Sequence, residues 1–313
     1  MNTSDQVTVF GSFVVDLMAR TPRLPVPGET VKGTFFKQGA GGKGFNQGIA
    51  AHKAGGNVVM ITKLGRDSLA QVATDAMDAV GLPKDSLFYN DEVATGVALI
   101  MVNETTSQNE IVVVPGACGT ITDRDIAGVE NKICDSAYIL FQLEVNQDAN
   151  EKVARMAKEH GVKVIINTAP YQPMSDEFLR GAYLVTPNET EAEAMTGIAV
   201  TDLESADRAA KVIMDKGVQN VLITLGSKGV YINTLGKSEI IPAYRVNAVD
   251  TTGAGDAFNG GLLTALAEGR SLTDAARFAN ALAAISVQRI GTTPSMPTRA
   301  EVDAFLEERG GIQ

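Results

Sequence analysis

A run of small residues with a carboxylate at each end offers the clearest chemistry in this chain of 313 residues. The run extends from Asp250 to Asp256, contains Gly253 and Gly255, and leads into the helix-like segment 259–266. Glycines let backbone N–H groups approach a ligand closely, and a helix N-terminus favours anions. Such amides can hold the charge that develops in phosphoryl transfer, while Asp256 takes a proton from the attacking hydroxyl. The alternative is that Asp256 only caps the helix.

A second glycine-rich stretch, residues 39–44, also opens a helix-like segment. It fits the spacing G-x-G-x-x-G, but it follows a polar strand, and we find no acidic residue about twenty positions on, so we reject a dinucleotide fingerprint. A P-loop is rejected because Lys43 is followed by Gly44, where Ser or Thr is required. Lys43 and Asn46 lie one helical turn apart and could hold sugar hydroxyls. A purely structural turn is the alternative.

Apolar strand-like runs alternate with helical segments along most of the chain. Continuous apolar strands between helices predict a mainly parallel sheet covered on both faces, which is an α/β/α sandwich of three layers. The predicted strands of this sheet are 7–10, 57–62, 138–141, 162–166, 182–185 and 221–224, with a hairpin at 229–232 and 239–241. The predicted helices are 45–51, 68–79, 150–160, 189–195, 205–216, 260–268, 272–287 and 298–308.

Three more exposed strands, at about 30–38, 95–102 and 110–115, are expected to form a small separate sheet. The last two are joined by a polar turn that is typical of a hairpin. No long linker or internal repeat divides the sequence. We therefore expect a single domain spanning 1–313, into which the small sheet is inserted.

Several polar or glycine-rich turns follow the predicted parallel strands. Asp16 follows the first strand and Glu144 follows the run 138–143, at the sheet edge where such folds bind ligands. Carboxylates there can accept hydrogen bonds from sugar hydroxyls, although a solvated Glu144 is an open alternative. Asn188 with a nearby acid could bind phosphate oxygens and hydrated Mg²⁺, and the turn 225–229 could lie along a nucleotide.

The overall charge and composition narrow the classes of protein. The net charge of −10 argues against a nucleic-acid or anionic-membrane partner. The first residues do not resemble a signal peptide, and no apolar run reaches membrane-spanning length. The expected class is a cytoplasmic enzyme that acts on a small molecule.

These motifs together resemble the ribokinase family, also called the phosphofructokinase-B carbohydrate kinases. The resemblance spans roughly residues 7–306 and rests on Gly-Gly-Lys-Gly-x-Asn within 39–46 and Asp-Thr-x-Gly-Ala-Gly-Asp-x-Phe at 250–258. The turns 188–191 and 226–229 also match. It implies an ATP-dependent kinase that phosphorylates the O5 hydroxyl of a pentose, D-ribose or 2-deoxy-D-ribose. A hexose or nucleoside kinase is the alternative within the family, and a non-catalytic sugar- or nucleotide-binding regulator is the alternative outside it.

The resemblance also implies roles for individual residues. Asp256 would be the catalytic base, with an anion hole at Gly253, Ala254 and Gly255. The residues expected to contact the sugar, besides Asp256, are Asp16, Gly42, Lys43, Asn46 and Glu144. Those expected to contact ATP are Asn188, Thr224, Gly226, Ser227, Gly229, Gly255 and Asn280. Those expected around a monovalent cation, usually K⁺, are Asp250, Thr252, Ser286, Arg289, Gly291 and Ser295. Glu191 would help to organise Mg²⁺ through water. The small sheet would be a lid over the sugar, and two lids would pair in a homodimer.

One position departs from the family pattern. Ribose-phosphorylating members carry Asn two residues before the first sugar-binding Asp, where this chain has Val14. An Asn can hydrogen-bond a ribose hydroxyl and a Val cannot, and a buried hydroxyl without a partner costs about 1–3 kcal/mol. The substitution predicts that the enzyme prefers or tolerates 2-deoxyribose.

Overall fold

A nine-stranded sheet forms the centre of the protein, whose computed structural model describes residues 5–106, 108–234 and 237–311. Its strand order is β13-β12-β11-β10-β9-β8-β1-β4-β5, parallel from β11 to β5 and antiparallel at β12 and β13. The strands are β1 (Gln6–Phe10), β4 (Asn57–Gly65), β5 (Leu87–Asn90), β8 (Tyr138–Phe141), β9 (Lys163–Ile166), β10 (Leu184–Val185), β11 (Val221–Thr224), β12 (Val230–Thr234) and β13 (Lys237–Ile241).

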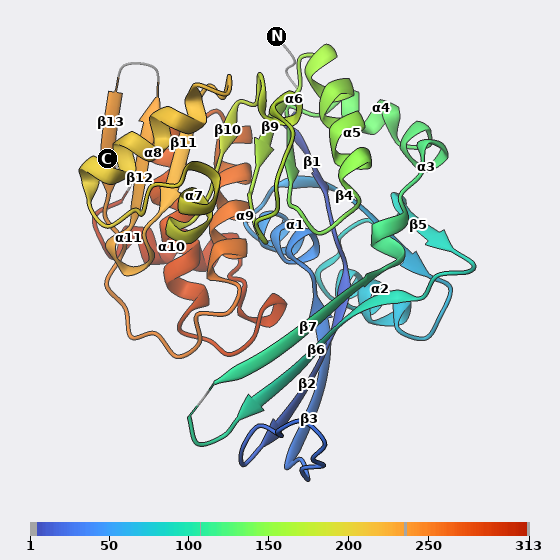
Figure 1. Cartoon of the computed structure of the whole chain (residues 1–313). Coiled ribbons are helices and arrows are strands. Elements are labelled where there is room, and N and C mark those ends of the chain that lie inside the picture. Colours follow the sequence, from blue (N-terminus) through green and yellow to red (C-terminus); the bar gives the residue numbers. More distant parts are fainter. Residues whose placement is uncertain (1–4, 107, 235–236, 312–313) are drawn as a thin grey trace.

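Helices cover both faces of this sheet (Figure 1). Two buried apolar clusters lie on opposite sides of the strands, because successive strand residues point to opposite faces. One cluster includes α1 (Lys43–Lys53), α2 (Ala70–Val80), α9 (Ala254–Ala267), α10 (Leu272–Ser286) and α11 (Arg299–Glu307). The other includes α3 (Asp123–Ala127), α4 (Glu130–Cys134), α5 (Gln147–Glu159), α6 (Asp176–Leu179), α7 (Glu189–Thr196) and α8 (Leu203–Met214). The predicted three-layer α/β/α sandwich is confirmed.

A second sheet of four strands projects from the body (Figure 1). Its order is β3-β2-β6-β7, with β2 and β6 parallel and the other pairs antiparallel. Its strands are β2 (Val14–Thr21), β3 (Phe35–Gly41), β6 (Thr95–Asn103) and β7 (Asn109–Gly116). The 3₁₀ turn η1 (Ala117–Thr120) follows β7 and returns the chain to the body.

The small sheet differs from the sequence-based expectation in two respects. Strand β2 was not predicted; it starts three residues after β1 and places Asp16 inside a strand, not in a loop. Strand β3 begins later than expected and absorbs residues 39–41, because they pair with β2 in register. The extents of β2 and β3 were decided by pairing with strands distant in the sequence, and not by the local pattern of apolar and polar residues.

Other differences from the prediction concern short elements and one helix start. The strand β5 and the five-residue helices α3 and α4 were missed, since such short segments have little periodicity. Helix α9 begins at Ala254, six residues before the predicted start, so Asp256 lies in its first turn. Among the residues that the structure describes, no helix is long and apolar enough to span a membrane.

Candidate active site

The start of helix α9 forms the floor of the candidate site. Gly253 is the residue that caps this helix, and its φ of 77° is a conformation that favours glycine. The first amides of a helix have no partner within the helix, so those of Gly255 and Asp256 face outward along the axis. The Ala254 amide differs, since it donates to the Thr251 carbonyl oxygen at 3.2 Å. The arrangement provides an anion-binding helix end beside a carboxylate.

The Asp256 carboxylate is buried and held by two amide side chains of α1. Asn46 Nδ2 donates to Asp256 Oδ2 at 3.0 Å, and Gln47 Nε2 donates to Asp256 Oδ1 at 2.9 Å. Burial raises the pKa of Asp256 above its usual value, while Lys43, Gln47 and Asn46 act in the opposite direction. A carboxylate with a raised pKa is a better proton acceptor, which suits a general base.

Glu144, which follows β8, hydrogen-bonds both the segment after β1 and the start of α1. Its Oε2 accepts hydrogen bonds from the Lys43 backbone amide at 2.8 Å and from the Ser12 hydroxyl. Burial acts to lower the pKa of Lys43, but the carboxylates of Asp256, Glu144 and Glu191 outweigh it and raise that pKa. The side chain of Lys43 is therefore a partly buried cation near three carboxylates.

Asp16 reaches the same place from strand β2 of the small sheet. Burial, together with the charges of Glu144 and Asp256, raises the pKa of Asp16 to about 6. Gly41 lies against this carboxylate: a Cβ there would come within 2.3 Å of Asp16 Oδ1. Three acids that sequence places far apart thus share one region, and their repulsion is relieved when hydroxyl donors bind between them.

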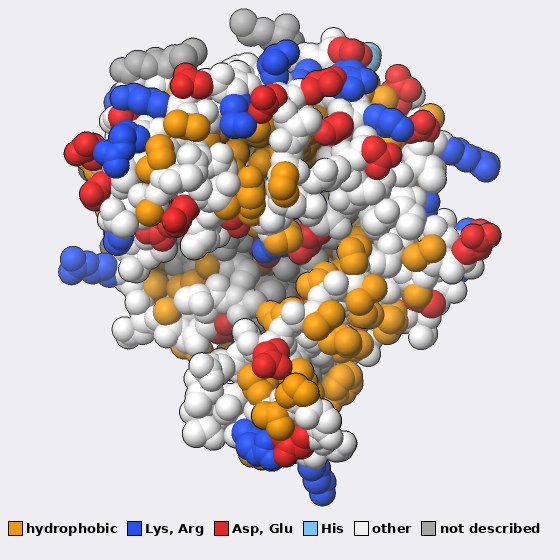
Figure 2. Space-filling model, viewed as in Figure 1, with side chains coloured by type: hydrophobic (Ala, Val, Ile, Leu, Met, Phe, Trp, Pro, Cys, Tyr) orange, Lys and Arg blue, Asp and Glu red, His pale blue; other side chains and the backbone are white. Residues whose placement is uncertain are grey.

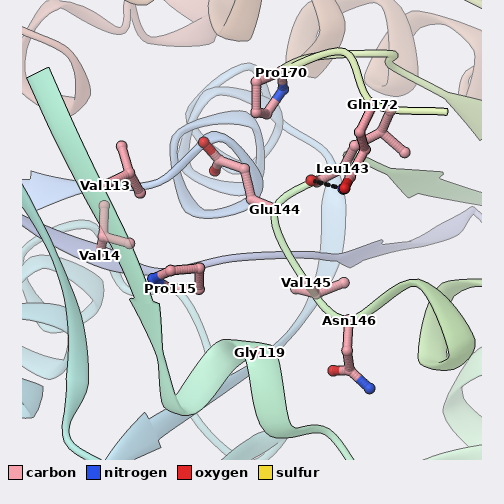
Figure 3. A pocket seen from close by; sticks show the side chains of 10 residues that line it. All are labelled: Val14, Val113, Pro115, Gly119, Leu143, Glu144, Val145, Asn146, Pro170 and Gln172. Carbon is pink, nitrogen blue, oxygen red and sulfur yellow. Dashed lines mark hydrogen bonds between the residues drawn. The ribbon is translucent and has the colours of Figure 1, made fainter.

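A pocket of about 320 Å³ opens next to these residues (Figure 3). Val14 and Glu144 line it, together with Val113, Pro115, Gly119, Leu143, Val145, Asn146, Pro170 and Gln172. Within the described part of the chain, Asn46, whose nitrogen donates to Asp256, has a buried Oδ1 with no hydrogen-bond partner. An unsatisfied buried oxygen is costly, so a ligand hydroxyl donor would be favoured there.

Most of the residues predicted for the nucleotide lie at or just after the ends of β10 and β11. Asn188 caps α7, and it forms an isolated parallel bridge with Thr224. Glu191 is occupied locally: its carboxylate accepts from the Asn188 amide at 3.0 Å and from Thr168 Oγ1 at 3.0 Å. Gly226, Ser227 and Gly229 lie in the turn around η2 (Gly226–Lys228). Asn280 lies on α10, where its Nδ2 donates to the Pro242 carbonyl oxygen at 3.2 Å.

Asp250 links the two segments predicted for a monovalent cation. It accepts hydrogen bonds from the amides of Thr252 and Gly291, both at 2.9 Å. Burial acts to raise the pKa of Asp250, and these amides outweigh it and lower that pKa. Ser286 and Ser295, which lie a few residues from Gly291 in the sequence, are buried. The side chain of Arg289 forms an ion pair with Glu301, in which Arg289 Nη2 lies 2.6 Å from Glu301 Oε1. Any role of Arg289 toward a cation therefore falls to its backbone oxygen.

Four residues of the site region were missed by the sequence reasoning: Gln47, Asn167, Thr186 and Asn259. Gln47 contacts Asp256 directly, and the others continue a buried hydrogen-bond chain from it. A signal was present for two of them. Asn167 and Thr186 directly follow β9 and β10, and a place after a predicted parallel strand was also the signal that singled out Asp16 and Glu144 in the sequence.

Comparison with known proteins decides the family. Residues 4–299 match the pfkB family of carbohydrate kinases. The chain belongs to this family. It is accordingly an ATP-dependent carbohydrate kinase, and the match includes both glycine-rich stretches and Asp256.

Its relatives cover nearly the whole chain. A ribokinase of Haemophilus influenzae is 43% identical over 96% of this chain and 98% of its own length. A deoxyribokinase of Salmonella typhi is 34% identical over 96% of this chain and 98% of its own. Among solved structures, Arabidopsis thaliana ribokinase complexed with ribose and ATP aligns with a TM-score of 0.89 at 32% identity, covering 96% of this chain and 97% of that one. The predicted fold class and enzyme class are confirmed.

We predict that Asp16→Asn stabilises the sugar-free protein near neutral pH. The folded-state pKa of Asp16 is about 6, above its ordinary 3.8, so ionising Asp16 costs the folded state free energy as pH rises from about 4 to 6. Removing the charge should increase the free energy of unfolding by about 2 kcal/mol at about pH 7.5, and the gain should vanish toward pH 4. Chemical denaturation at both pH values measures this.

Asp67→Asn is the matched control. Burial acts to raise the pKa of Asp67, but hydrogen bonds from Thr95, Ala70 and Leu69 outweigh it and lower that pKa. The control should therefore lose stability at about pH 7.5. An Asp16→Asn protein that is no more stable than wild type there would contradict the prediction.

Proposed function

We propose that this kinase transfers the γ-phosphoryl group of ATP to the O5 hydroxyl of a pentose, D-ribose or 2-deoxy-D-ribose. The observation that carries the proposal is the buried Asp256 carboxylate, held by Asn46 and Gln47 where α9 begins. It lies in the region of the Asp16 and Glu144 carboxylates, beside the pocket lined by Val14. Relatives named ribokinase and deoxyribokinase support a pentose as acceptor.

In the proposed reaction, Asp256 takes the proton of O5 as that oxygen attacks the γ-phosphorus. The O5–P bond forms, the bond from phosphorus to the β,γ-bridging oxygen breaks, and ADP leaves. The amides at Gly253, Ala254 and Gly255 lie at a helix N-terminus, where they can stabilise the charge on the transferring group. The Ala254 amide would exchange its bond to Thr251 for the phosphoryl oxygen. Lys43 would neutralise charge between sugar and phosphate.

The proposed nucleotide site uses the turns after β10 and β11 and the buried face of α10. Its residues are Asn188, Thr224, Gly226, Ser227, Gly229, Gly255 and Asn280. In the described ranges no three His, Cys, Asp or Glu residues are grouped to hold a metal, so Mg²⁺ would enter on the phosphates of ATP, with Glu191 acting through water. Asp250, Thr252, Ser286, Arg289, Gly291 and Ser295 would hold K⁺, which supplies positive charge beside the helix end.

Val14 and the small sheet are proposed to select and enclose the sugar. Val14 is 3% exposed and lines the pocket opposite Glu144 (Figure 3), where it offers no hydrogen bond to a hydroxyl. A sugar without the 2-hydroxyl fits that wall better. We propose that the four-stranded sheet is a lid within one domain, and that its closure excludes water, which otherwise competes as acceptor.

Pairing of two lids in a homodimer is supported by the exposed surface of the sheet. Hydrophobic side chains gather over it in Figure 2, and β7 presents Val112 and Val114, each about half exposed, on the face opposite Val113, which lines the pocket. Strand β7 is also an edge strand, and a long apolar edge is a template for association.

The first test assays ADP release from Mg-ATP with pentoses, hexoses and nucleosides, with and without K⁺. We expect a pentose to give the highest kcat/KM and K⁺ removal to lower kcat. Asp256→Asn should reduce kcat by roughly 10³-fold or more, with the sugar dissociation constant changed far less, because only the proton acceptor is lost. Near-normal turnover in Asp256→Asn, or a hexose or nucleoside as the best acceptor, would rule the proposal out.

The second test concerns the sugar. Val14→Asn should shift the ratio of kcat/KM for ribose over 2-deoxyribose toward ribose by about 10-fold or more, since the amide gives the 2-hydroxyl a partner. Val145→Asn, the same change elsewhere in the pocket lining, should affect both sugars alike. A strong ribose preference in the wild type would end the deoxyribose hypothesis.

The third test concerns assembly. Sedimentation should give the wild type twice the chain mass of 32.9 kDa, and Val112→Lys should reduce it to one chain, because the charge cannot be buried between apolar sheets. Leu203→Lys on α8 changes an equally exposed apolar residue outside the lid and should leave the mass unchanged. A wild type that sediments as a single chain would refute lid pairing.

A further inference from the structure

A buried chain of hydrogen-bonded side chains, most of them amides, begins at the Asp256 carboxylate. Gln47 lies at its centre. The Nε2 of Gln47 donates both to Asp256 Oδ1 at 2.9 Å and to Asn167 Oδ1 at 3.0 Å. Its Oε1 accepts from Gln142 Nε2 at 2.6 Å. Gln47 and Gln142 are completely buried. Both N–H donors and one lone pair of the oxygen of the Gln47 amide group are thus bonded to groups of the protein.

The chain continues from Gln47 and returns to the helix that carries Asp256. Asn167 Nδ2 donates to the Thr186 carbonyl oxygen at 2.9 Å, and Thr186 Oγ1 donates to Asn259 Oδ1 at 2.7 Å. Asn259 Nδ2 then donates to the Gly255 carbonyl oxygen at 2.8 Å. The chain therefore joins the carboxylate of Asp256 to the first turn of α9.

Groups that can only accept fix the direction of every bond in this chain. The carbonyl oxygens of Thr186 and Gly255 have no proton to give, so Asn167 and Asn259 must direct their nitrogens toward them. Asn167 then presents only its oxygen to Gln47, and Gln47 must present its NH₂ group to both Asn167 and Asp256. A flip of the Gln47 amide would set its oxygen against two acceptors, Asp256 Oδ1 and Asn167 Oδ1, and its nitrogen against one donor, Gln142 Nε2.

We infer that Gln47 is a positioning residue that aims the Asp256 carboxylate and holds it as a hydrogen-bond acceptor, and that the amide chain through Asn167, Thr186 and Asn259 fixes Gln47 in that role. This inference rests on the proposed function, in which Asp256 is the base. A protonated Asp256 finds no acceptor in Gln47, whose oxygen is turned away to Gln142. The chain thus opposes protonation of Asp256 at Oδ1, the oxygen that accepts from Gln47.

The inference makes the pH dependence of turnover its main readout. The charged groups that face Asp256 are Lys43 of α1, Glu144 after β8 and Asp16 of β2. None of them is a hydrogen-bond partner of Gln47 in the described structure, so their own titrations should be common to all Gln47 variants. A shift of the acidic limb on changing Gln47 then reports on Asp256.

The test compares Gln47→Met with wild type over a pH series at saturating sugar and Mg-ATP. Methionine keeps the length of the side chain and removes the donor. The acidic limb of kcat should move up by about one pH unit or more, because a hydrogen bond to a charged group is lost. At about pH 7.5, kcat should fall about 10- to 100-fold while KM for the sugar changes by less than about threefold.

Two further variants keep the test decisive. Gln47→Glu keeps the acceptor for Gln142 and adds a like charge next to Asp256, so its limb should move further up than that of Gln47→Met. Asn150→Leu removes another buried amide, whose one donated hydrogen bond in the described ranges goes to the Gln142 backbone oxygen at 2.9 Å, and its limb should stay at the wild-type position. If Gln47→Met is not stable enough to assay, Gln47→Glu alone decides.

The outcomes separate this inference from the proposed function. If the acidic limbs of both Gln47 variants coincide with that of wild type and Asp256→Asn is inactive, the inference is overturned and Asp256 remains the base. Limbs that also move in Asn150→Leu show a merely structural effect and overturn it too. An active Asp256→Asn protein overturns the proposed function itself.

Discussion

Burial of the negative charge of Asp256 is the constraint on which the rest of this site depends. A carboxylate taken out of water is costly unless charges and hydrogen bonds compensate it. Here the compensation comes from one helix, α1, whose first turn supplies Lys43, Asn46 and Gln47. The same burial makes Asp256 a stronger proton acceptor, because its pKa is raised. The site therefore requires α1 to lie close to the start of α9, and much of the fold serves that approach.

Glycines make the approach of the two helices possible. A Cβ at Gly260 of α9 would come within 2.6 Å of Ala50 Cβ and 2.7 Å of the Gln47 carbonyl oxygen, so no larger residue fits where α9 crosses α1. At the other end of α1, a Cβ at Gly44 would come within 2.6 Å of Gly11 Cα. Gln142, Asn167 and Thr186, which directly follow β8, β9 and β10, lie next to this crossing of α1 and α9. The sheet edge thus supplies rigid polar support where parallel sheets generally bind ligands.

In contrast to the polar support around Asp256, the small sheet contributes an uncompensated carboxylate and an apolar side chain. It brings the apolar side chain of Val14 to one wall of the pocket, and it places Asp16, a carboxylate with a pKa of about 6, near Glu144 and Asp256. Asp16 faces like charges and has no hydrogen-bond donor among the described residues, so hydroxyl groups bound there would relieve an unfavourable state. Much of the rest of the sheet is apolar and exposed, which links sugar enclosure to the surface proposed for assembly.

The sequence by itself determined the layer architecture, the two glycine-rich helix starts and the candidate base, because periodicity and glycine spacing are local signals. It also placed Asp16, Lys43, Asn46 and Glu144 in one site through their positions after strands or at a helix start. Only the tertiary structure decided that residues 14–21 form a strand of the small sheet, since their pairing partners lie in β3 and β6. Only it joined Gln47 to Asn167 and Asp256, residues 120 and 209 positions away. Hydrogen bonds between distant segments leave no spacing in the sequence, so the support of the base became visible only when the helices and strand ends were packed together.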